Sequence, residues 1–205
     1  MSPNAIKLSG AIIHDLEGLG ALAVETPADV ASTIAAAATI LDDQLGPGAA
    51  EALRHVTVNI GRIEGGLKLN MIAPSCRTGI DLRCPVGVST DVLLREVEKI
   101  LQRYQATADV RYAVVNRGEP NHCDPRHPMV EIIQANAERV RGIRPVPSIS
   151  LGGTDARLWR LAGIPAFIYG PSPNNMGAPD EHVTLDDLFG TVWVHVLSAY
   201  DYLTG

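Results

Sequence analysis

A glycine-rich segment at residues 150–157, with the sequence SLGGTDAR, is the first candidate for chemistry in this chain. It lies between a predicted strand and a predicted helix, so backbone N–H groups near Gly153 and Thr154 would point out of a helix N-terminus with partial positive charge. Glycine lets a ligand approach the backbone, Thr154 adds a hydroxyl, and Arg157 can bind a carboxylate through two hydrogen bonds. The segment predicts an anion or carboxylate site. A tight strand-to-helix turn capped by Thr154 is the alternative.

A second polar loop, residues 170–183, follows another predicted strand. Ligands collect at the ends of parallel strands in α/β proteins, which makes this loop a candidate for the same site. Asp180, Glu181 and His182 are residue types that bind metal ions or transfer protons. A lead-in to the helix that follows is the simpler interpretation of the same residues.

The sequence HCDPRH at residues 122–127 places two imidazoles, a thiol and a carboxylate close together, as a zinc site would. Prolines break the chain just before a predicted helix, and no second ligand pair of recognisable spacing follows. We therefore expect Asp124 or His127 to cap that helix. His55 and His195 are expected to be structural residues without a partner nearby in sequence.

The composition limits which classes of protein this chain can belong to. With 205 residues, 46% of them hydrophobic and 20% charged, the chain can bury a core in one or two domains. A net charge of −6 and 4% aromatic residues count against nucleic-acid binding. Three cysteines without a CxxC pair indicate a reducing compartment. The longest run of small apolar residues, 35–41, is too short to cross a membrane. We expect a cytoplasmic protein with small-molecule or protein partners.

The first part of the chain predicts helices and antiparallel strands. Its helices are expected at 4–22, 29–45 and 90–104, the last capped by Ser89, and its strands at 55–63, 67–72, 78–84 and 109–115, with a hairpin turn at 64–66. This order is a ferredoxin-like split βαβ arrangement that lacks its first strand. Asn70 and Arg83 lie towards the ends of two of these strands, where a polar side chain reaches either a neighbouring site or solvent.

The pattern changes near residue 119, where we place a domain boundary. Helices are expected at 129–140, 155–161 and 187–203, with short buried strands at 146–150 and 165–169. A helix between two such strands indicates a parallel α/β sheet. Both halves lack elements on their N-terminal side, so the chain is interpreted as the back portion of a longer protein. Overlooked strands at 21–25 or around Val146 are the alternative.

Taken together, these segments resemble the M20 family of metal-dependent amidohydrolases and peptidases, which includes acetylornithine deacetylase and succinyl-diaminopimelate desuccinylase. Each motif is short, but their order and spacing agree over most of the chain. The matching motifs are SPNAI at 2–6, VNIGRIEGG at 58–66, NMIAP at 70–74, DLR at 81–83, DPRHP at 124–128, GGTDAR at 152–157, and GIP, YGP and PDE between 163 and 181.

The resemblance implies an α/β protein with an α+β lid. Residues 1–118 would be a ferredoxin-like lid or dimerisation domain, and residues 119–205 the C-terminal portion of a zinc-peptidase-like α/β catalytic domain. The complete family enzyme holds two divalent metal ions, with zinc expected, and a glutamate acts as general base. The resemblance places nearly all of those groups in a segment before this chain. It also implies a homodimer formed through the lid.

The family's remaining metal-ligand histidine would stand at Gly177, and glycine has no side chain to bind a metal. His182 is the nearby candidate to replace it. The lid histidine that polarises the scissile carbonyl in family members would lie upstream of residues 2–6. We therefore assign no metal ligand and no catalytic residue in this chain, and expect the isolated chain to bind no metal ion and to be inactive.

The resemblance assigns the substrate-binding role to five residues. Gly153 and Thr154 match the family's carboxylate cradle, Arg157 matches the same motif, and Asn70 and Arg83 match polar positions of the lid. We expect the substrate-binding portion of an amidohydrolase that acts on N-acyl amino acids or dipeptide-like carboxylates. A non-catalytic dimerisation or small-molecule-binding module is the alternative.

Overall fold

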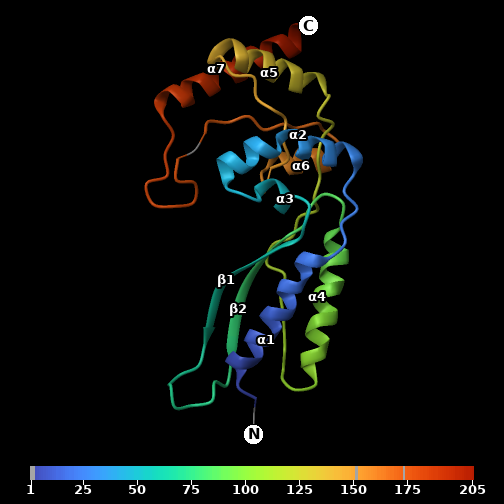
Figure 1. Cartoon of the computed structure of the whole chain (residues 1–205), viewed down its shortest axis with the longest axis vertical. Helices are drawn as coiled ribbons and strands as arrows, with labels where there is room; N and C mark the ends of the chain where they lie inside the picture. The colour runs from blue at the N-terminus through green and yellow to red at the C-terminus, as the bar shows by residue number, and fades with distance from the viewer. Residues whose placement is uncertain (1–2, 151, 173) are drawn as a thin grey trace. The chain divides into compact units, whose positions relative to one another are not determined.

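The computed structural model describes residues 3–150, 152–172 and 174–205. Ser2, Leu151 and Pro173, which belong to three of the motifs above, lie outside the described residues. The chain divides into two compact units (Figure 1): unit 1 comprises Met1–Ala31 and Ala38–Pro120, and unit 2 comprises Ser32–Ala37 and Asn121–Gly205.

Two helices of unit 1, which begin at Ala5 and at Thr90, start where a side chain accepts backbone hydrogen bonds. Asn4 Oδ1 accepts from Ile6 N–H at 3.1 Å, and Ser89 Oγ accepts from Val92 N–H at 3.3 Å, so the predicted Ser89 cap is confirmed. Such caps satisfy donors that the first helical turn leaves without partners. The elements of unit 1 are α1 (Ala5–Glu17), η1 (Gly18–Ala21), α2 (Ala28–Leu45, whose residues 32–37 belong to unit 2), α3 (Ala49–Ala52), β1 (Thr57–Gly65), β2 (Cys76–Arg83) and α4 (Thr90–Gln105).

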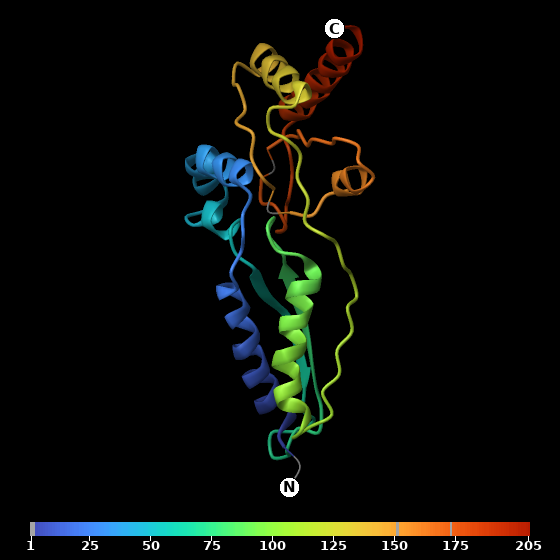
Figure 2. The same ribbon diagram turned by 90° about the vertical axis from the view of Figure 1, so that its right-hand side faces the viewer.

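The core of unit 1 lies between its two long helices and the strands. Figure 2 shows α1 and α4 side by side in front of β1 and β2. The predicted apolar stripe of α4 faces this core, since a helix buries residues spaced three and four apart. The buried side chains of the cluster are Leu16, Leu19, Val56, Val88, Leu93, Val97, Ile100 and Leu101.

The sheet of unit 1 is an antiparallel pair. β1 and β2 pair from Thr57 with Arg83 to Gly65 with Cys76, and the register shifts at Gly61. The predicted hairpin turn at 64–66 is wrong because Gly65 still pairs in β1. The predicted strand at 67–72 is also wrong: these residues form an exposed loop, closed by a hydrogen bond from Met71 N–H to the Lys68 carbonyl at 3.1 Å. Leu67 and Leu69 find no core to face, so nothing holds this stretch in the sheet.

The other expected strands are wrong for a related reason. Residues 109–115, 146–150 and 165–169 form no ladder in the part of the chain that the structure describes. A strand needs a neighbouring strand that satisfies its backbone N–H and C=O groups, and no strand pairs with these segments in the described ranges. Residues 109–115 run as a separate trace beside α4 (Figure 2). The fold is therefore a mixture of helices and a small sheet, and the ferredoxin-like lid is not confirmed.

Unit 2 is built on two packed helices. Asn136 of α5 donates from Nδ2 to Asp201 Oδ2 of α7 at 2.8 Å, and Arg141 of α5 pairs with Asp187 of α7. The predicted helices 129–140, 155–161 and 187–203 are confirmed within two residues at each end. No described helix is long and apolar enough to cross a membrane. The elements of unit 2 are α5 (Pro128–Arg141), α6 (Ala156–Leu161) and α7 (Leu185–Thr204), together with residues 32–37.

A substitution at Gly87, which lies between β2 and α4, tests the packing of unit 1. Its φ is +117°, and an added Cβ would lie 2.5 Å from the Glu25 carbonyl oxygen. Gly87→Ala is expected to lower the free energy of unfolding by about 2 kcal/mol or more, since strain and overlap add. Gly10→Ala is the control, because a Cβ there meets nothing within 4 Å, and it should stabilise α1 by about 0.5–1 kcal/mol. Urea unfolding measures both variants. Equal unfolding midpoints for Gly87→Ala and the wild type would contradict this packing.

The ion pair between Arg141 of α5 and Asp187 of α7 can be tested through its dependence on pH. The hydrogen bond from Arg141 lowers the pKa of Asp187, with help from Thr184. A lowered folded-state pKa stabilises the fold above the ordinary aspartate pKa, and this contribution is lost as the pH falls through the folded-state value. Asp187→Asn should therefore lower the Tm at pH 7. Its difference in Tm from the wild type should begin to shrink below about pH 4 and vanish only below the lowered folded-state pKa of Asp187. Equal Tm values at pH 7 would show that the pair contributes nothing, and a difference that stays constant down to about pH 3 would show that the loss does not come from the ionised carboxylate.

Candidate functional site

The glycine-rich segment of unit 2 leads into α6. Ser150 Oγ accepts from Gly152 N–H and donates to the Gly152 carbonyl, both at 3.1 Å. Asp155 occupies the N-cap of α6 without a side-chain cap, and the Thr154 carbonyl accepts from Arg157 N–H at 3.1 Å. The alternative interpretation, a turn capped by the Thr154 hydroxyl, is therefore wrong.

The hydroxyl of Thr154 is left without a hydrogen-bond partner. Thr154 Oγ1 is buried and bonds to nothing among the described residues. A buried polar atom without a partner costs about 1–3 kcal/mol, so this oxygen needs an explanation. Next to it, Gly153 is exposed, and a Cβ built on it would meet nothing within 4 Å. The pair thus combines an open backbone with an unused hydroxyl, which an incoming acceptor such as a carboxylate would engage.

α6 is held in place by Asn121. Asn121 Nδ2 donates to the Arg157 carbonyl at 3.2 Å, and its Oδ1 accepts from Arg160 Nε at 2.6 Å. Arg160 also donates to the Ala166 carbonyl at 2.8 Å. The Arg157 side chain is half-buried and makes no ion pair within the described ranges.

The two polar residues expected in the lid belong to unit 1. Asn70 lies on the exposed loop 66–75 rather than on a strand. Arg83 is the last residue of β2, as expected, and its Nε donates to Asp81 Oδ2 at 2.9 Å. Gly153, Thr154 and Arg157 thus lie in unit 2, and Asn70 and Arg83 lie in unit 1.

The loop containing Gly177 is held by hydrogen bonds between its own residues. Asn174 and His182 form a bridge, with N–H···O distances of 2.8 and 3.2 Å. Glu181 Oε2 accepts from Gly177 N–H at 3.2 Å, and His182 Nδ1 lies 2.7 Å from the Asp180 carbonyl. A carbonyl only accepts, so His182 Nδ1 carries the proton. The predicted helix lead-in at 179–181 is wrong, since Thr184 caps α7.

The residues present do not fit the metal pair that the resemblance implies. Gly177 has φ +72° and no side chain, and the Glu181 carboxylate braces its N–H group. Within the described ranges, no group of three or more His, Cys, Asp or Glu side chains could hold a metal ion, so His182 belongs to no such group. No metal centre is therefore built from the residues that the structure describes.

The HCDPRH segment has a structural role, as expected. His127 Nδ1 accepts from Met129 N–H at 3.1 Å at the start of α5, and its ring lies 5.0 Å from that of Phe167. Asp124 accepts from Arg126 N–H at 2.9 Å, and hydrogen bonds from Arg126 lower the pKa of Asp124. The predicted capping is confirmed.

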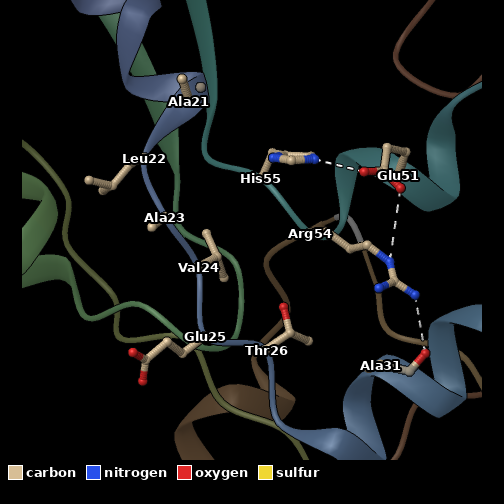
Figure 3. A pocket seen from close by; sticks show the side chains of 11 residues that line it. Ala21, Leu22, Ala23, Val24, Glu25, Thr26, Ala31, Glu51, Arg54 and His55 are labelled. Carbon is tan, nitrogen blue, oxygen red and sulfur yellow. Dashed lines mark hydrogen bonds and ion pairs between the residues drawn. The ribbon is translucent and has the colours of Figure 1, made fainter.

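Unit 1 contains a cavity of about 590 Å³ that the sequence analysis did not anticipate (Figure 3). Segment 20–26 lies on one side, and Glu51, Arg54 and His55 on the other. His55 Nε2 lies 2.8 Å from Glu51 Oε1, and Arg54 donates to the Ala31 carbonyl at 3.3 Å. The expectation that His55 has no partner nearby in sequence is wrong, and the four-residue spacing to Glu51 was the signal. None of the five predicted substrate-binding residues lines this cavity.

Comparison with known proteins gives a consistent family. A family model described as "Peptidase family M20/M25/M40" matches residues 10–199. The acetylornithine deacetylase of Vibrio parahaemolyticus is 27% identical over 199 residues, covering 92% of this chain and 49% of that protein. The succinyl-diaminopimelate desuccinylase of Sulfurovum sp. is 24% identical over 126 residues, which is 62% of this chain and 34% of that protein.

A further relative and a solved structure agree with these. The N-formyl-4-amino-5-aminomethyl-2-methylpyrimidine deformylase of Bacillus subtilis is 28% identical, covering 64% of this chain and 35% of that protein. The crystal structure of an M20 family metallo-carboxypeptidase from Sulfolobus solfataricus superposes with a TM-score of 0.68 at 19% identity, covering 98% of this chain and 53% of that one. The chain thus spans between about a third and about half of the length of the curated relatives.

The capping role of His127 is testable. His127→Ala removes the acceptor for Met129 N–H, and should lower the free energy of unfolding by about 1 kcal/mol. His127→Asn supplies another good N-cap acceptor, and should recover part of that loss. Thermal unfolding with EDTA and with added zinc measures both variants. A zinc-dependent rise in Tm for the wild type that His127→Asn abolishes would show instead that His127 binds metal.

Proposed function

The chain belongs to peptidase family M20/M25/M40, and from this premise we propose that it is the substrate-binding portion of a metal-dependent amidohydrolase. Its relatives are hydrolases, named as deacetylases, a desuccinylase and a deformylase. The proposed substrates are N-acyl amino acids or dipeptide-like molecules that carry a carboxylate.

The unused hydroxyl of Thr154 carries this proposal. A substrate carboxylate would accept a hydrogen bond from Thr154 Oγ1 and from backbone N–H groups near Gly153, whose open surface admits the ligand. Arg157 would add a charge-assisted hydrogen bond, which is stronger than a neutral one. These contacts hold and orient the substrate by its carboxylate. The cost of leaving the hydroxyl unbonded in the empty protein would be recovered on binding.

We further propose how the rest of the chain is used. Residues 1–118 would serve as the lid and dimerisation domain, with Asn70 and Arg83 facing the substrate, and residues 119–205 as part of the catalytic domain. The exposed positions of both side chains and the unpaired edges of the two-strand sheet support this assignment. A homodimer through the lid follows from the same proposal.

Hydrolysis by the 205-residue chain alone is not part of the proposal. Gly177 supplies no metal ligand, and the structure gives the loop around it a different brace. The same observation favours the second candidate, a non-catalytic module that binds small carboxylates or dimerises. The two candidates share the carboxylate cradle and differ in whether a complete protein with these residues turns over substrate.

Thr154→Val separates binding from structure. Removing a buried hydroxyl without a partner should leave the unfolding free energy unchanged or raise it, because valine fills the same space without an unsatisfied atom. The same substitution should weaken the binding of N-acetyl amino acids about tenfold or more, a change of about 1.4 kcal/mol. Titration calorimetry and thermal unfolding measure the two effects. Unchanged affinity would contradict the carboxylate role of Thr154.

Arg157→Ala is expected to weaken the same ligand about tenfold or more, through the lost charge-assisted hydrogen bond. Arg95→Ala on α4 is the charge-matched control and should leave affinity unchanged, since Arg95 is an exposed residue of unit 1.

A separate assay of the 205-residue chain on N-acetyl and N-succinyl amino acids with zinc or manganese should give no turnover. Turnover by the chain alone would refute its proposed inactivity, but would not contradict the proposed carboxylate site.

A further inference from the structure

α6 follows Thr154 closely in the chain and has little apolar packing of its own. It spans only Ala156–Leu161, and none of its side chains is buried. Its large apolar side chains, Leu158, Trp159 and Leu161, are 52%, 59% and 55% exposed, respectively. Isolated helices shorter than about 12 residues are marginal in water, and protein helices are held mainly by burial of an apolar face. In the part of unit 2 that the structure describes, the position of α6 therefore depends on polar contacts.

The side chain of Asn121 supplies two of these polar contacts at once. Its Nδ2 donates to the Arg157 carbonyl at 3.2 Å, and its Oδ1 accepts from Arg160 Nε at 2.6 Å. A carbonyl only accepts and an arginine Nε only donates, so these two partners fix the orientation of the amide. Residues three apart are neighbours on a helix surface, which lets one amide reach both. Asn121 therefore holds α6 at two points.

The hydrogen bonds of Asn121 continue to the residue that carries the unused hydroxyl. The peptide of Arg157 is held on both sides: its carbonyl accepts from Asn121, and its N–H donates to the Thr154 carbonyl at 3.1 Å. Only the Arg157 backbone thus stands between Asn121 and Thr154. A shift of the Asn121 amide would move the Arg157 backbone, and with it the two side chains that the proposed function assigns to the substrate carboxylate.

The bridge between Asn121 and α6 is itself anchored at Ala166. The Ala166 carbonyl accepts from Arg160 Nη1 at 2.8 Å, and Cys123 Sγ lies 3.7 Å from the same oxygen. Arg160 therefore joins Asn121 on one side to Ala166 on the other, and Cys123 ties the segment that follows Asn121 to the same point. Side chains that are linked in such a network restrain one another more than separate contacts do.

We propose that Asn121 is a positioning residue of the carboxylate site: its two hydrogen bonds to α6 hold Thr154 and Arg157 in the arrangement that binds the substrate. This inference rests on the proposed function, since it concerns that same site. Asn121 is given no contact with the substrate. It acts through α6, because binding groups that are ordered beforehand do not have to be ordered when the ligand binds.

The first experiment compares Asn121→Ala with Asn116→Ala in the 205-residue chain. Asn116 is an exposed asparagine of unit 1 and is the matched control. Asn121→Ala should speed hydrogen exchange of the α6 amides about tenfold or more, while the α7 amides keep their wild-type rates, because only the local restraint is lost. Asn116→Ala should change neither set of rates.

Calorimetry with N-acetylglycine then separates positioning from a purely structural role. Asn121→Ala should raise the dissociation constant about tenfold, because two side chains would have to be ordered on binding. A purely structural role would lower the Tm but leave the affinity of the folded molecules unchanged. Asn116→Ala should bind N-acetylglycine as the wild type does.

Arg160→Leu provides a second variant that breaks the same bridge from its other side. It should speed exchange in α6 and weaken N-acetylglycine to a similar extent. The double variant Asn121→Ala/Arg160→Leu should be within about twofold of either single variant, since residues of one network are not additive. If Asn121→Ala does not fold, Arg160→Leu alone carries the test.

Three results would overturn the proposal: unchanged exchange in α6, faster exchange in α6 with unchanged affinity, or effects of the two substitutions that multiply as for independent sites. A wild-type chain that does not bind N-acetylglycine would contradict the proposed function instead. Exchange needs no ligand, so it would still decide whether Asn121 holds α6, and the two failures are distinguishable.

Discussion

Backbone pairing between β1 and β2 is the interaction that organises unit 1. The ladder satisfies the N–H and C=O groups of both strands and presents Val58, Ile80 and Leu82 to the core. α1 and α4 then bury their apolar stripes against that face (Figure 2). The capping contacts at Asn4 and Ser89 fix where the two helices begin. An isolated pair of strands is marginal in water, so the helices and the ladder stabilise each other.

The same requirement explains what is unusual in unit 2. α5 and α7 form a helix pair with a buried polar contact through Asn136, but the extended segments beside them have no ladder within the described ranges. Helices can complete their backbone hydrogen bonds locally, whereas strands depend on neighbours. The helix pair is therefore formed while the extended segments stay without a ladder in the described ranges.

Much of the helical structure could be predicted from the sequence, and much of the sheet could not. Apolar spacing and the Ser89 cap located α4 because those signals are local. Residues 67–72 and 165–169 carry strand-like patterns, but pairing depends on segments far away, which periodicity does not report. The glycine-rich segment pointed to Gly153 and Thr154, yet only the structure shows that the Thr154 hydroxyl lacks a partner. The pairing of Glu51 with His55 was visible in the spacing and was overlooked.

Unit 2 holds the Thr154 hydroxyl without a partner among the described residues, and a loop in which the Gly177 N–H group donates to Glu181. We propose that this chain contributes substrate binding to an M20-type hydrolase without contributing a metal centre. The most direct measurement is elemental analysis of the pure 205-residue chain after dialysis against zinc and manganese. The account predicts a metal content far below one equivalent per chain. A stoichiometric ion that survives dialysis would contradict it, and would mean that His182 or the 122–127 segment builds a site.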